Sequence, residues 1–168
     1  MEPAAGPVGG LWIGTASGVS RYDGNTFSNF EIPEANITGH VASLMWSMAE
    51  DREGNIWFGS NGRGVFRYDG TDMARFSRQD GLGSDIVQTI MQDRAGVLWF
   101  GTRDGGLSRY DGIAFAPSPM KADADGGYVW TMLEDRAGSL WVGTSGGVYR
   151  FNGKTFSNFT REDAERKP

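Results

Sequence analysis

The residues that could carry out catalysis are few in this chain of 168 residues. His40 is the only histidine, and there is no cysteine. These counts exclude a histidine-rich or thiolate metal site and a serine triad with a spare base. Carboxylates can still hold a hard cation. We expect instead a protein that is not an enzyme and that uses no cofactor and no metal.

Side chains suited to binding are found at positions that vary between otherwise similar segments. Trp46, Gln88 and Trp130 each precede an Asp-Arg pair by five residues, so one position alternates between aromatic and polar side chains. Charged residues that differ between copies follow two Trp-Phe-Gly segments. Aromatic and charged groups of this kind orient small organic ligands, so the expected partner is a small molecule or a glycan. The candidate ligand-binding residues are Trp46, Arg63, Gln88, Arg103, Asp104 and Trp130.

A short motif that occurs four times sets the frame around these positions. Each copy has a tryptophan followed two residues later by glycine, and the tryptophans are 45, 42 and 42 residues apart. The copies are LWIGT from Leu11, IWFGS from Ile56, LWFGT from Leu98 and LWVGT from Leu140. A period of this length indicates a chain built from similar structural units.

Each unit contains the residues of four short strands. The tryptophan motif is followed by a glycine-rich turn and a run such as GVFRYDG from Gly64, and then by a third run such as TFSNF at residues 26–30. Asp-Gly pairs between such runs are typical of hairpins. The fourth strand of each unit comes from apolar runs that end just before the next tryptophan motif, namely VASLMWSMAED, IVQTIMQD and YVWTMLED.

This pattern predicts an all-β fold, a β-propeller of four repeats of about 42 residues with four strands each. The apolar run is expected to be the innermost strand, because only the stacking of one sheet on the next buries both faces of such a sheet. A linear β-solenoid is the alternative architecture. It needs parallel coils, whereas the Asp-Gly hairpins indicate antiparallel meanders.

The first repeat is expected to lack its innermost strand. Residues Met1–Ala5 occupy the corresponding position, and Met-Glu-Pro-Ala-Ala cannot supply an apolar strand. We therefore expect a flexible segment at 1–10, a three-stranded blade at 11–40, and a polar tail at 161–168. The four-stranded blades are expected at 41–77, 86–119 and 128–160.

These motifs resemble the two-component regulator propeller repeats, whose pattern runs ED-R-x-G-x-L-W-x-G-T and then G-G-[LV]-x-R-[YF]. Residues 98–111 and 134–151 match it closely, and the resemblance covers roughly residues 11–160. It implies the extracytoplasmic sensing region of a bacterial histidine kinase, and hence ligand or partner sensing in the periplasm or outside the cell. Streptogramin-lyase-type propellers have a similar repeat, and they are the enzyme alternative that His40 and a divalent ion would serve.

Residues that keep their identity in every copy are expected to serve the fold. Aspartate can accept hydrogen bonds from backbone amides and glycine accepts positive φ, so each Asp-x-x-Gly segment should form the turn before a tryptophan strand. The framing tryptophans should pack between sheets. The arginines that recur at one frame position should pair with frame aspartates between blades, and they are Arg21, Arg67, Arg109 and Arg150.

The loops that vary most are expected to form one binding face. They are the turns after the tryptophan strands and the connections at residues 31–40, 77–85 and 116–127. In a propeller both sets emerge on the same side of the sheets, and ligands usually gather there.

Charge and hydropathy exclude two classes of partner. The net charge is −5 and the isoelectric point is near 4.9, so there is no basic stripe for nucleic acid or for an anionic membrane. Met1–Gly10 contain no apolar run typical of a signal peptide, and no later segment approaches the length of a membrane span.

A structural or assembly role is the third alternative. Four blades of this length are few for a closed ring, because each blade would have to span a quarter turn. Repeats of this length more often build rings of six to eight blades. An open end would expose an apolar blade face. We therefore expect self-association, most simply a homodimer that completes an eight-bladed ring.

Overall fold

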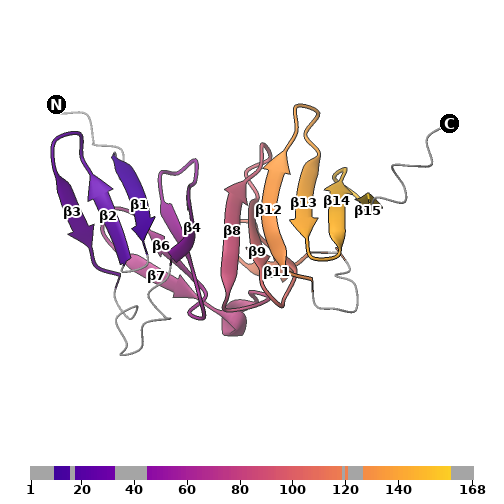
Figure 1. Ribbon diagram of the computed structural model, residues 1–168, viewed down its shortest axis with the longest axis horizontal. Coiled ribbons are helices and arrows are strands. Elements are labelled where there is room, and N and C mark those ends of the chain that lie inside the picture. The colour runs from indigo at the N-terminus through magenta and orange to yellow at the C-terminus, as the bar shows by residue number, and fades with distance from the viewer. Residues whose placement is uncertain (1–9, 16–17, 33–44, 119, 121–126, 160–168) are drawn as a thin grey trace.

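The structure is a computed structural model that describes residues 10–15, 18–32, 45–118, 120 and 127–159. These residues form β-strands and one short 3-10 helix, η1 (Arg78–Asp80), which lies between the seventh and eighth strands. The strands make four antiparallel sheets in chain order (Figure 1). The fold is therefore all-β and propeller-like, as the repeat predicts.

The strands of each sheet follow one another along the chain. The first sheet has β1 (Leu11–Thr15), β2 (Gly18–Tyr22) and β3 (Phe27–Phe30). The second has β4 (Met45–Glu50), β5 (Ile56–Ser60), β6 (Val65–Tyr68) and β7 (Met73–Phe76). The third has β8 (Val87–Gln92), β9 (Leu98–Thr102), β10 (Leu107–Tyr110) and β11 (Phe115–Pro117). The fourth has β12 (Val129–Glu134), β13 (Leu140–Thr144), β14 (Gly147–Phe151) and β15 (Phe156–Phe159).

The four sheets stand in an open row. In Figure 1 the first sheet lies at the left end and the fourth at the right end, with the second and third between them. The apolar runs β4, β8 and β12 are neighbours, with β8 in contact with both of the others. The first sheet has three strands within the described residues and lacks the strand that corresponds to these three. Both observations agree with the predicted strand order.

Hairpin turns fold as the Asp-Gly pairs predict. Asp69 accepts hydrogen bonds on Oδ1 from the backbone amides of Thr71 and Asp72, at 2.9 and 2.8 Å. Gly70 has φ +101, a left-handed conformation in which a Cβ would be strained. This turn ends β6 and brings β7 back beside it in antiparallel register.

The turn before each tryptophan strand is held by its aspartate. Asp51 accepts on Oδ1 from the backbone amide of Asn55 at 2.8 Å and on Oδ2 from the indole Nε1 of Trp57 at 2.7 Å. The same indole hydrogen bond occurs in the other two turns, where Trp99 donates to Asp93 at 2.7 Å and Trp141 donates to Asp135 at 2.8 Å. Backbone capping by the aspartate is confirmed. The indole bond is a second link, which fixes the ring of each tryptophan before it packs.

Each sheet has two different apolar faces. The tryptophan face carries the framing tryptophan, and the leucine face carries the leucine or isoleucine before it. The tryptophan face of the second sheet, with Trp57 and Val65, packs on the leucine face of the third sheet, with Leu98 and Phe100. The same pairing joins the first sheet to the second and the third to the fourth. Trp57 and Trp99 are buried, so the interpretation of these tryptophans as core residues is confirmed.

Two of the recurrent arginines lie against the framing tryptophan of their own sheet, and their predicted pairing with frame aspartates stays a prediction. The guanidinium carbon of Arg67 lies 5.8 Å from the Trp57 ring centroid, and Arg150 lies 5.6 Å from Trp141 in the same way. The indole Nε1 donates to the turn aspartate, and the arginine makes a cation–π contact with the electron-rich ring face.

Several turn carboxylates are stabilised in their charged form. The pKa of Asp135 is lowered from its ordinary value of 3.8, chiefly by the hydrogen bond from the Trp141 indole and then by the Ser139 amide. The pKa of Asp69 is also lowered, chiefly by the backbone amides of Asp72 and Thr71. Each hydrogen bond favours the charged form of its acceptor.

We predict that these carboxylates make the protein less stable in acid. A carboxyl group whose pKa is lower in the folded chain contributes stability that is fully present above its unfolded pKa and is lost as the pH falls through the folded pKa. The urea midpoint should therefore be nearly constant between about pH 7 and about pH 5 and should fall below about pH 4. In Asp135→Asn the fall should be shallower, and an unchanged slope would contradict the role of this carboxylate.

No helix in the described part of the chain is long and apolar enough to cross a membrane.

Candidate functional site

A β-bulge interrupts each of the three inner strands at the same place. In the second sheet Met45 pairs with Ser60 and Ser47 pairs with Gly59, so Trp46 has no partner residue on β5. The same shift leaves Gln88 of β8 and Trp130 of β12 as extra residues. Bulges redirect side chains and are common beside binding sites. Trp46, Gln88 and Trp130 are called the bulge row below.

The bulge row extends across three neighbouring sheets, since β8 contacts both β4 and β12. Trp46 is exposed, and Trp130 exposes 57% of its surface. Gln88 is half-buried, and its Oε1 has no hydrogen-bond partner among the described residues. The bulge row therefore presents two exposed apolar rings, which suit a ligand with an apolar face, whereas the unsatisfied Gln88 oxygen is itself buried.

The two predicted loop sets do lie together, at the end of the strands where the bulges are. The amides of Gly62 and Gly64, in the turn after β5, donate to the carbonyl of Asp85 at 2.9 and 2.7 Å. Within the third sheet, the amide of Arg103, directly after β9, donates to the carbonyl of Ile86, directly before β8, at 3.0 Å. The loop sets are therefore joined by backbone hydrogen bonds beside the start of β8.

An aromatic stack stands at the fourth-sheet end of the bulge row. The rings of Tyr128 and Trp130 are stacked, with centroids 5.4 Å apart and an interplanar angle of 12°. Arg103 donates from Nε to the Tyr128 hydroxyl at 3.0 Å, and its guanidinium carbon lies 5.2 Å from the same ring centroid. The arginine comes from the third sheet and the rings from the fourth, so the stack bridges two blades. We call Arg103, Tyr128 and Trp130 the aromatic platform.

The other predicted site residues lie at the same end of the sheets but are not part of the aromatic platform. Arg63 lies in the β5–β6 turn, where its amide donates to the Ser60 hydroxyl at 3.1 Å. Asp104 is exposed in the β9–β10 turn. No hydrogen bond or ring contact between described residues joins Trp46, Gln88 or Asp104 to another of the predicted site residues.

Tyr128 is a functional candidate that the sequence interpretation missed. It stands directly after the variable connection at residues 116–127 and two residues before Trp130. Residues two apart on a strand point to the same side, and that spacing was the available signal. Its hydroxyl orients the Arg103 guanidinium, so the tyrosine is central to the platform.

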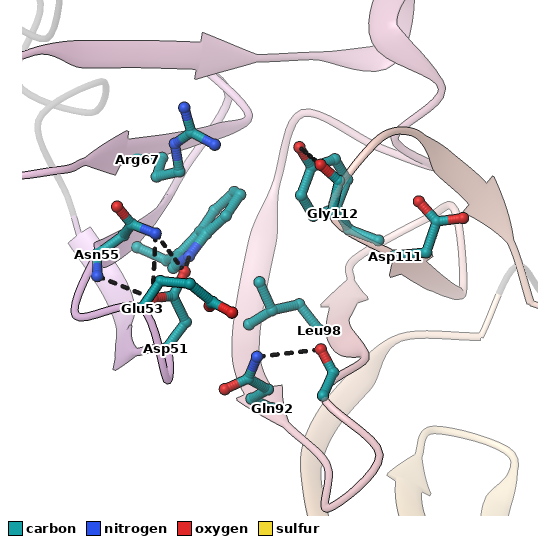
Figure 2. A pocket seen from close by; sticks show the side chains of 11 residues that line it. Asp51, Glu53, Asn55, Arg67, Gln92, Leu98, Asp111 and Gly112 are labelled. Carbon is teal, nitrogen blue, oxygen red and sulfur yellow. Dashed lines mark hydrogen bonds between the residues drawn. The ribbon is translucent and has the colours of Figure 1, made fainter.

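A cavity of about 270 Å³ lies at the other end of the strands, between the second and third sheets (Figure 2). Its lining includes Asp51, Arg67, Gln92 and Asp111. Asp51 is occupied by Asn55 and the Trp57 indole, and the Gln92 amide donates to the Gly96 carbonyl at 3.0 Å. Its polar groups are mostly engaged by the frame of the fold, so the platform is the better candidate site.

The enzyme alternative depends on His40, a carboxylate and a divalent ion. His40 lies outside the described residues. Within the described ranges, no three histidine, cysteine, aspartate or glutamate side chains come together as a metal site.

Comparison with known proteins connects the chain to repeat propellers. A model of the Two component regulator propeller family matches residues 41–62, 81–104 and 123–146. Each match runs from an inner strand, or the connection before it, to the end of the following tryptophan strand or the turn after it. No curated protein matches the chain.

Solved structures share the fold at low sequence identity. The extracellular domain of BT3049, assigned to a hybrid two component system of B. thetaiotaomicron, is 22% identical with a TM-score of 0.74, and the match covers 91% of this chain and 22% of that one. A streptogramin B lyase is 17% identical with a TM-score of 0.69, covering 90% of this chain and 51% of the lyase. Virginiamycin B lyase from Staphylococcus aureus is 15% identical with a TM-score of 0.67, covering 86% of this chain and 49% of that one.

These relatives are longer than the chain, which spans 22% of BT3049 and about half of the lyases. The likenesses show a propeller fold that sensor domains and lyases share. The matched repeats contain the tryptophan motifs and the bulged inner strands described above. The chain therefore carries two component regulator propeller repeats.

Proposed function

We propose that the chain is a non-catalytic binding module of the sensing type, and that its ligand is a small molecule or a glycan held on the bulge row and the aromatic platform. The observation that carries this proposal is the exposed Trp130 ring, stacked on Tyr128 and braced by Arg103 from the neighbouring sheet. An exposed aromatic stack keeps apolar surface in contact with water and adds little to the stability of the fold. Ligand binding is therefore the role that accounts for it.

The chemistry of the platform indicates which ligands suit it. The free face of an indole ring offers a flat apolar surface, and the neighbouring guanidinium of Arg103 offers hydrogen-bond donors. A pyranose ring has an apolar face edged by hydroxyl groups and matches this combination. A polyanion is disfavoured by the net charge of −5.

The extracellular domain of BT3049 and the lyases share this fold but differ in their roles, so the fold does not select between binding and catalysis. The binding role is favoured here by the site. The platform is built from aromatic and guanidinium groups, which bind and orient, and its three residues include no histidine or carboxylate to act as a general acid or base.

We predict that Trp130→Ala weakens binding of short oligosaccharides about 5- to 150-fold, because loss of one stacked ring removes on the order of 1–3 kcal/mol. Calorimetric titration with a panel of tri- to hexasaccharides measures the effect. Ile113→Ala is the matched control, since Ile113 is a fully solvated apolar residue in the β10–β11 turn at the far end of the sheets. If a saccharide bound the wild type and both variants with equal affinity, the platform would not be its site.

A further inference from the structure

The two ends of the row expose opposite faces. Leu11 of the first sheet is 59% exposed on the leucine face, whereas its counterpart Ile56 in the second sheet is 3% exposed. Phe27, on the same face, is also exposed and stacks on Tyr22 of its own sheet, with ring centroids 4.6 Å apart. In the three following sheets this face is the one that the preceding sheet covers.

The fourth sheet exposes the complementary face. Leu133 and Val148 are 64% and 42% exposed on its tryptophan face, whereas Val65, the counterpart of Val148, is fully buried. Trp141 and Phe159 lie on the same face with ring centroids 5.4 Å apart. The first and fourth sheets thus each expose an apolar patch within the described residues, and each patch is one half of a pairing that the fold already makes.

The internal interfaces show what covers such a face. In all three of them a tryptophan face packs on a leucine face, and none of the three clusters joins two faces of one kind. The residues involved have the same character in each case, an indole and a valine or leucine against branched and aromatic side chains. The fourth sheet therefore needs a leucine face, and the first sheet of another copy presents one.

Pairing of like faces is disfavoured by charge. Arg150 lies on the tryptophan face, with its guanidinium carbon 5.6 Å from the Trp141 ring centroid, and its Nε is buried without a hydrogen-bond partner among the described residues. Two tryptophan faces brought together would place two such cations in one apolar interface, where like charges are costly. A leucine face brings no cation at the corresponding positions, which Leu11, Tyr22 and Phe27 occupy.

We propose that a second copy of this chain covers both end faces, so that two chains join head to tail. The tryptophan face of each fourth sheet packs on the leucine face of the partner's first sheet. Because each chain offers one face of each kind, two copies make two identical contacts and the ring closes. The product has eight blades, within the usual range of four to eight.

Sedimentation of the full chain tests this proposal. At about 50 µM the wild type is expected at twice the 18.3 kDa of one chain. Leu133→Glu and Val148→Glu place a carboxylate on the tryptophan face, and Leu11→Glu and Phe27→Glu place one on the leucine face. Each variant alone is expected at 18.3 kDa with the circular dichroism of a folded β protein. Ile113→Glu, on neither face, should keep the mass of two chains.

Mixing the variants separates head-to-tail pairing from other arrangements. Leu133→Glu retains an intact leucine face and Leu11→Glu retains an intact tryptophan face, so an equimolar mixture can make one intact contact. It should recover the mass of two chains, whereas neither variant does so alone. Contacts between like faces would give no recovery in the mixture.

Three results would overturn the proposal. One is a wild type that stays at 18.3 kDa at 50 µM, including a monomer that associates only when blades of another propeller are added. Another is a mass that rises with concentration beyond two chains, because such a contact does not close. The last is a pair of chains that both sets of glutamate variants leave intact. Failure here leaves the saccharide site untouched, since none of the substituted residues belongs to the platform or the bulge row.

Discussion

Trp57→Ala is expected to unfold the protein or to bring it to the edge of unfolding. The indole of Trp57 is almost wholly buried between the second and third sheets, and it contacts the rings of Phe100 and Tyr110 at centroid distances of 5.4 and 5.5 Å. Truncation of a buried tryptophan to alanine costs about 3–5 kcal/mol. Since a domain of this size has about 5–15 kcal/mol in total, the loss is a large fraction.

Trp141→Ala is the matched control for this prediction. Its indole donates to Asp135 at 2.8 Å and lies under Arg150, as Trp57 does with Asp51 and Arg67. The difference is the neighbouring sheet, which covers Trp57 and not Trp141 within one chain. In dilute protein, urea unfolding should show a cost of about 1 kcal/mol for Trp141→Ala. Equal costs at the two positions would contradict the account in which blade-on-blade packing holds the fold together.

Asp51→Ala is expected to cost about 3 kcal/mol through lost hydrogen bonds. The carboxylate is buried and accepts from the backbone amide of Asn55 at 2.8 Å and from the Trp57 indole at 2.7 Å, and its two oxygens also accept from the Asn55 side chain. A buried donor left without an acceptor costs about 1–3 kcal/mol, so the indole and the part-buried donors of Asn55 together account for the expected loss. Thermal and urea unfolding both measure it.

Asp69→Ala provides the comparison for Asp51. Asp69 also accepts hydrogen bonds, but its donors, the amides of Thr71 and Asp72, are exposed and can bind water when the carboxylate is removed. A cost below about 1 kcal/mol is expected there. If Asp69→Ala were as damaging as Asp51→Ala, burial of the donors would not be the cause of the larger effect.

The turns, hairpins and framing tryptophans of this fold are largely predictable because the sequence contains four copies of the tryptophan motif. A hairpin at Asp69-Gly70 or a turn at Asp51 depends on neighbours within a few residues, and the copies show which of those residues are required. The packing of Trp57 and Trp99 follows for the same reason, since strict repetition of a large apolar residue indicates contact between units.

The site is less predictable because it depends on how separate strands pair. The variation among Trp46, Gln88 and Trp130 indicates a candidate position, but the bulge that redirects these side chains is a shift in register between two strands. The contact between Arg103 and Tyr128 joins two sheets and has no counterpart in the other repeats. The cation–π contacts of Arg67 and Arg150 were not predicted, because the sequence shows that aspartates and tryptophans are near these arginines but not which ring face each guanidinium lies over.

The most direct test of the proposed function is a titration followed by the indole N–H signals of the six tryptophans in a nitrogen-15 spectrum. Trp46 and Trp130 report on the bulge row, whereas Trp57 and Trp99, whose indoles donate to aspartates, report on the frame and on the far end of the sheets. With a bound oligosaccharide, we expect the Trp46 and Trp130 signals to shift and saturate together while the Trp57 and Trp99 signals stay in place. Shifts at Trp57 alone would place the ligand in the cavity at the opposite end of the sheets. If no tryptophan signal moved with any saccharide up to about 10 mM, a concentration well beyond a weak millimolar dissociation constant, the binding role would be contradicted.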